Sequence, residues 1–116
     1  MWTEITTPET LETILSRQGD VPVLLFKHST RCPISARALR AVESWLAEHP
    51  NLVHPCRILV VEHRAVSNLA AERLGIRHES PQAMLLRDGR VVWHASHLSI
   101  QGDALDAALR QSAVSS

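Results

Sequence analysis

The segment HSTRCPIS, at residues 28–35, places a cysteine directly before a predicted helix, with a serine three positions after it. A cysteine at the start of a helix is favoured as the thiolate, because unpaired backbone N–H groups and the helix dipole stabilise negative charge there. Lys27, His28 and Arg31 add basic side chains close to Cys32 in the sequence. The segment therefore predicts a nucleophilic thiol.

Pro33 and Ser35 limit the chemistry that this thiol can perform. Proline suits the first position of a helix, where its missing N–H would be unpaired anyway, so Pro33 fixes the conformation in which the helix starts. Ser35 stands where a dithiol motif has its second cysteine, so a mixed disulfide on Cys32 cannot be resolved within the motif. The serine hydroxyl can instead donate a hydrogen bond to the thiolate. We predict one-thiol exchange with Cys32, Pro33 and Ser35 as catalytic residues, and a buried, inert cysteine is the alternative.

Cys56 is the other cysteine of the chain, and it opens the second predicted strand, whereas Cys32 follows the end of the first. If these strands are parallel, the two cysteines lie at opposite ends of the sheet, roughly 20 Å apart at the rise of a strand. A disulfide needs its Cα atoms within about 7 Å. We therefore predict that Cys56 is a packing residue rather than a second reactive thiol.

Length and composition favour one small globular domain. The 116 residues are 45% hydrophobic, and we expect a single domain over residues 1–116 with a frayed tail at 113–116. The 12 basic and 12 acidic side chains cancel, which gives no support to nucleic-acid binding. No apolar run approaches the roughly 20 residues of a membrane span and no signal-peptide pattern is present, so we expect a cytoplasmic protein without membrane contact. The histidines form no zinc-like spacing with the cysteines, and we predict no metal site.

The elements that must position Cys32 follow from hydrophobic periodicity and from turn residues. They are, in order, a helix over 7–19, a strand over 21–28, a helix over 34–48, a strand over 56–63, a helix over 65–75, a hairpin over 82–96 and a helix over 102–112. The first helix has Thr7 as N-cap, Pro8 at its first position and Gly19 as its stop. Asp88 and Gly89 are the hairpin turn. The alternation of strands and helices implies parallel pairing of the first two strands.

Several segments in order, KHSTRCPIS, VSN, GIRHESPQAMLL and GRVVWHASH, together resemble the monothiol bacilliredoxins over nearly the whole chain. The match to the family's TCPIS-type motif departs at Arg31, before the cysteine. The resemblance implies a thioredoxin-like α/β fold with a mixed sheet flanked by helices, the active cysteine at a helix N-terminus, and a cis Ser80–Pro81 bond before the C-terminal hairpin. It also implies a thiol oxidoreductase that removes bacillithiol, a bacterial low-molecular-weight thiol, from mixed disulfides on proteins.

In open α/β sheets, ligands bind outside the carboxyl ends of the parallel strands, and the candidate substrate contacts gather there. They are Lys27, His28, Arg31, Arg64, Asn68, Ser80, Pro81, Ser96 and His97. In a thioredoxin-like site, the backbone of Ser80 offers hydrogen bonds to the incoming disulfide. The malate carboxylates of bacillithiol would suit Arg64 or the N-terminus of the last helix.

The expected partners are bacillithiol, which acts as a co-substrate, and bacillithiolated proteins; no bound cofactor is expected. The sequence does not identify the reductant that resets Cys32. Free bacillithiol, another redoxin and a flavin-dependent reductase are the three candidates. Two alternatives from other functional classes keep the same fold. One is a glutaredoxin-like module that holds a 2Fe–2S cluster, for which the stiff Pro33 is unfavourable, and the other is a non-catalytic adaptor.

Overall fold

The computed structural model describes residues 1–114, with the side chains of residues 1–112. Its elements are β1 (Thr3–Glu4), α1 (Pro8–Leu15), β2 (Val23–His28), α2 (Pro33–Glu48), β3 (His54–Leu59), α3 (Arg64–Leu74), β4 (Gln82–Arg87), β5 (Arg90–Ser96), the 3-10 helix η1 (His97–Ser99) and α4 (Gly102–Val114). Of the tail predicted to fray, residues 113 and 114 belong to α4, and residues 115 and 116 lie outside the described residues. None of the helices within residues 1–114 is long and apolar enough to cross a membrane.

The five strands form one mixed sheet in the order β1-β3-β2-β4-β5. The strands β1, β3 and β2 run parallel, which confirms the parallel pairing predicted for the first two apolar runs. β4 is antiparallel to both β2 and β5. The register places Lys27 of β2 between Ile58 and Gln82. The carboxyl end of β2 therefore meets the end of β3 and the start of β4.

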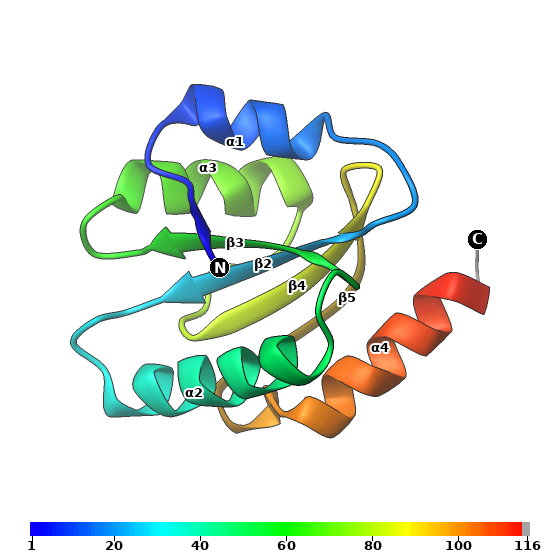
Figure 1. The fold of residues 1–116 in the computed structure, drawn as a ribbon. Coiled ribbons are helices and arrows are strands. Elements are labelled where there is room, and N and C mark those ends of the chain that lie inside the picture. The colour runs from blue at the N-terminus through cyan, green and yellow to red at the C-terminus, as the bar shows by residue number, and fades with distance from the viewer. Residues whose placement is uncertain (115–116) are drawn as a thin grey trace.

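Helices cover both faces of the sheet, with α1 and α3 on one face and α2 and α4 on the other (Figure 1). All six residues of β2 are buried, as its continuous apolar run predicts. Leu24 and Phe26 belong to the core cluster under α2 and α4, whereas Leu25 belongs to the cluster under α1 and α3. Because side chains alternate along a strand, Lys27 points to the α1–α3 face and His28 to the α2–α4 face.

The hairpin of β4 and β5 confirms the turn predicted at Asp88 and Gly89. Both turn residues have a left-handed backbone, with φ of 52° at Asp88 and 78° at Gly89, which is typical of tight two-residue hairpin turns. A Cβ atom at Gly89 would also collide with the carbonyl oxygen of Leu15 at the end of α1. The turn therefore requires glycine both for its backbone conformation and for its packing.

The largest differences from the sequence prediction concern α1, β3 and β1. The helix α1 ends at Leu15 rather than near Gly19, because the Ser16 hydroxyl and N–H both bond to the Glu12 carbonyl and close the last turn. The strand β3 spans His54–Leu59 and not residues 56–63, because the N–H of His54 already pairs with Pro22 and the chain turns after Leu59. The two-residue strand β1 was not predicted.

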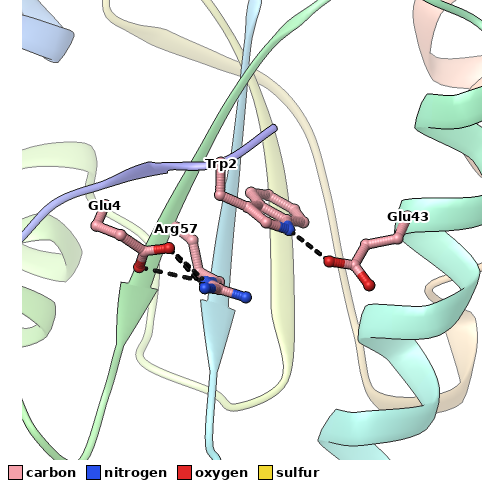
Figure 2. Close-up of polar contacts among 4 residues, drawn as sticks. All are labelled: Trp2, Glu4, Glu43 and Arg57. Atoms are coloured by element: carbon pink, nitrogen blue, oxygen red, sulfur yellow. Dashed lines mark hydrogen bonds and ion pairs between the residues drawn. The ribbon is translucent and has the colours of Figure 1, made fainter.

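A polar cluster fastens β1 to α2 and β3 (Figure 2). The indole Nε1 of Trp2 donates to Glu43 Oε2 of α2 at 2.8 Å, and Nη2 of Arg57 lies 2.6 Å from Glu4 Oε2. The Arg57 guanidinium also lies over the Trp2 ring, 5.5 Å from its centroid. The Trp2–Glu43 bond ties α2, which has Cys32 at its start, to the N-terminal segment, and the Arg57 contacts tie that segment to β3.

Candidate active site

Cys32 is the N-cap residue of α2, four residues after the end of β2. Its N–H donates to the Ser29 carbonyl at 3.3 Å, and its own carbonyl accepts a hydrogen bond from the Ala36 N–H at 3.0 Å. Pro33 occupies the first helical position, as predicted. The Cys32 side chain is half-buried, is not part of a disulfide and makes no capping hydrogen bond. The side chain therefore stands at the start of α2, which is the positive end of the helix dipole.

Ser35 is fully buried in the first turn of α2 and braces the loop before the helix. Its Oγ accepts a hydrogen bond from the Ser29 N–H at 2.9 Å and lies 2.8 Å from Nδ1 of His28. Among the described residues, no hydrogen bond joins Ser35 to Cys32, so the bond predicted between this hydroxyl and the thiolate is not formed. The hydroxyl points inward, where a backbone N–H and an imidazole nitrogen would otherwise be buried without a partner.

His28, a predicted substrate contact, is only 6% exposed and stacks on Phe26 with 5.9 Å between the ring centroids. Burial lowers the pKa of His28 below its ordinary value of 6.5, and the positive charge of Arg57 lowers it further. The ring is therefore neutral at neutral pH. In this position His28 supports Ser35 and has little surface with which to contact a substrate.

Replacement of Ser35 by alanine is expected to lower the free energy of unfolding by about 1–3 kcal/mol. The change leaves the Ser29 N–H and the His28 imidazole nitrogen without their common partner in a buried place. Urea unfolding of Ser35→Ala checks this, with Ser44→Ala on the exposed side of α2 as the matched control. An unchanged midpoint for Ser35→Ala would show that this brace contributes nothing to stability.

Lys27 lies on the opposite face of the sheet and is also fully buried. Its Nζ donates to the Ser67 carbonyl of α3 at 2.9 Å and lies 3.2 Å from Nδ1 of His78. Burial lowers the pKa of Lys27 from 10.5 to about 8. Lys27 was predicted to contact the substrate, but it has no exposed surface from which to do so. It instead ties β2 to α3 and to the segment that leads to Pro81.

Ser80 and Pro81 lie beside the end of β2, because the next residue, Gln82, pairs with Lys27. The Ser80–Pro81 peptide bond is cis, and the Pro81 side chain is buried. The carbonyl of Pro81 accepts a hydrogen bond from the His97 N–H at 3.1 Å. The Ser80 hydroxyl is buried and has no hydrogen-bond partner among the described residues. Through its pairing with β2 and the hydrogen bond from His97, this segment links the end of β2 to the start of η1.

The remaining predicted contacts divide between the two faces of the sheet. Ser96 pairs with Gln82 at the end of β5, and the exposed His97 follows it with a left-handed φ of 54°. Arg64 and Asn68 are exposed on α3, on the opposite face from α2. Arg31 is exposed directly before the thiol. The structure thus brings Ser96 and His97 beside Pro81.

Sequence reasoning missed the partners of Lys27, which are Ser67 and His78. A lysine inside a continuous apolar run must find polar partners when it is buried, and this could have indicated that Lys27 faces the protein interior. It also missed Arg37, which lines a groove along α2. Within the described residues, no group of three or more His, Cys, Asp or Glu side chains could hold a metal ion.

Comparison with known proteins gives a consistent result. Residues 3–105 match the family model described as monothiol bacilliredoxin BrxC. A solved structure described as a candidate oxidoreductase with a thioredoxin fold is 28% identical, with a TM-score of 0.83 and 92% of each chain covered. Thioredoxin from Trypanosoma brucei brucei is 15% identical, with a TM-score of 0.78, 97% of this chain covered and 91% of that one. A mutant thioredoxin from Halobacterium salinarum is 23% identical, with a TM-score of 0.71 and coverages of 95% and 88%. These likenesses confirm the predicted thioredoxin-like fold.

Proposed function

Because the chain belongs to the monothiol bacilliredoxin family, we propose that it removes bacillithiol from mixed disulfides on proteins, with Cys32 as the nucleophile. The family and the fold support a thiol oxidoreductase. The observation that carries the proposal is the half-buried thiol at the start of α2, with the buried Ser35 in the place of a second thiol.

The exchange step follows from this arrangement. The Cys32 thiolate attacks the sulfur that belongs to bacillithiol in the mixed disulfide of a client protein. The disulfide bond of the client breaks, a disulfide between Cys32 and bacillithiol forms, and the client sulfur leaves as a thiolate that takes a proton from water. One disulfide replaces another, so this step needs no oxidant, reductant or bound cofactor.

The thiol that resets Cys32 must come from outside the chain. Cys56 is the other cysteine, and it is fully buried in the core cluster under α1 and α3, beside Leu25 in the sheet. Burial raises the pKa of Cys56 from 9.0 to about 12, so its thiol is protonated and unreactive at neutral pH. Free bacillithiol, another redoxin or a flavin-dependent reductase would have to complete the cycle.

The experiment that tests the proposal compares two mixed disulfides of one client protein, one with bacillithiol and one with glutathione. The reduced protein is mixed in excess with each, and the appearance of the free client thiol is followed over time. We expect the bacillithiol adduct to be removed faster. Equal rates would contradict the assignment to bacillithiol, and no release from either client would favour a non-catalytic adaptor.

A further inference from the structure

A groove of about 430 Å³ lies between α2 and the turn that follows β5. Its walls include Ile34, Arg37 and Ala41 from α2 and His97, Leu98 and Gln101 from the opposite side. The volume lies within the range of sites that hold small molecules, which is about 300–1,000 Å³. Of the site residues predicted from the sequence, His97 is the one that lines this groove.

The groove begins within two residues of the reactive cysteine, although Cys32 itself does not line it. Ile34 lies two residues after Cys32, and Ala41 lies seven residues further along α2, so the groove follows the helix for on the order of 10 Å. The opposite wall is joined to the Pro81 carbonyl by the N–H of His97, at 3.1 Å. The groove therefore runs along α2 from the turn that follows Cys32 in the chain.

The side chains of the groove suit an anionic ligand with a compact body. Arg37 is exposed, and its guanidinium makes no hydrogen bond or ion pair with any residue in the described part of the chain. None of the described residues that line the groove is acidic. Ile34 and Leu98, which are 43% and 60% exposed, add apolar surface on either wall. A free guanidinium is the group best suited to bind a carboxylate through two hydrogen bonds.

We infer that this groove binds the part of bacillithiol beyond its sulfur, with Arg37 bound to the malate carboxylates and the sugar between Ile34 and Leu98. This inference rests on the proposed function and names the groups that would recognise the thiol. His97 and Gln101 offer polar atoms to the sugar hydroxyls. Arg64, the side chain expected from the sequence to bind the carboxylates, starts α3 on the opposite face of the sheet.

The test follows the reaction of the reduced protein with two small disulfides, bacillithiol disulfide and the disulfide of the same cysteinyl sugar without its malyl group. We expect Arg37→Gln to slow the reaction with bacillithiol disulfide about tenfold, the loss typical of one charge-assisted contact. The reaction with the compound that lacks the malyl group should keep its rate. Arg40→Gln, an exposed arginine of the same helix outside the groove, is the matched control.

The outcomes separate this inference from the proposed function. If the parent protein prefers bacillithiol and Arg37→Gln keeps that preference, the inference is wrong and the proposed function stands. Equal slowing with both disulfides would also overturn the inference, because Arg37 would then act on the thiol and not on the malyl group. Selective slowing by Arg64→Gln alone would place the carboxylates on the other face. If the parent reacts no faster with bacillithiol disulfide than with glutathione disulfide, the proposed function fails together with the inference.

Discussion

Replacement of Cys32 by serine is expected to reduce the release of bacillithiol from a client protein to the rate seen without any protein. An alcohol at neutral pH is a far weaker nucleophile than a thiolate. The other free cysteine, Cys56, is buried and does not lie at the start of α2. The measurement is the time course of free client thiol under the conditions used for the parent. Urea unfolding of Cys32→Ser should show that the fold is retained, because the side chain is half-buried and makes no capping hydrogen bond.

The matched control for this loss is Cys56→Ala. Cys56 is fully buried among the side chains under α1 and α3, so its replacement should lower stability modestly and leave the exchange rate nearly unchanged. If Cys56→Ala lost exchange to the same extent as Cys32→Ser while remaining folded, Cys56 would take part in the reaction. The burial of Cys56 in the core would then not suffice to keep its thiol out of the reaction.

The second large effect is a pH-dependent contribution of Lys27 to stability. The pKa of Lys27 is lowered by burial from 10.5 to about 8, so between these two values the folded protein binds fewer protons than the unfolded chain. Stability contributed by Lys27 therefore rises with pH across this window. Relative to Lys27→Met, which cannot titrate, the parent should gain about 3 kcal/mol from pH 8 to pH 10.5.

The comparison of two proteins is needed because Cys56 acts in the opposite direction. Burial raises the pKa of Cys56 from 9.0 to about 12, so stability falls as pH rises above 9.0 in both proteins. This loss cancels in the difference between the parent and Lys27→Met. Urea unfolding at intervals from pH 7.5 to pH 10.5 measures that difference. A difference that stays constant across the window would mean that Lys27 is not held in a desolvated site.

The parts of the fold that sequence predicted are those with local causes. Asp88 and Gly89 predict the hairpin because the turn itself requires their backbone conformation, and Pro33 predicts the start of α2 because proline suits only the first turn of a helix. The placement of Cys32 at a helix N-terminus follows from the same local signal. These features needed no knowledge of what packs against them.

The parts that sequence did not predict depend on contacts between distant segments. The strand β1 has two residues and exists because it pairs with β3, more than fifty positions away. Lys27 was predicted as a substrate contact because it is a basic residue close to Cys32 in the sequence, but alternation along β2 turns it toward Ser67 and His78. The groove at Arg37 forms where α2 meets the turn after β5, and neither segment alone indicates it.

The most direct test of the central claim is to locate the bacillithiol adduct on the protein. The reduced protein is incubated with bacillithiol disulfide or, separately, with glutathione disulfide, then alkylated, digested and analysed by mass spectrometry. We predict a bacillithiol adduct on the peptide that contains Cys32, no adduct on the peptide that contains Cys56, and much less adduct from glutathione disulfide. An adduct on Cys56, or equal modification of Cys32 by the two disulfides, would contradict the account.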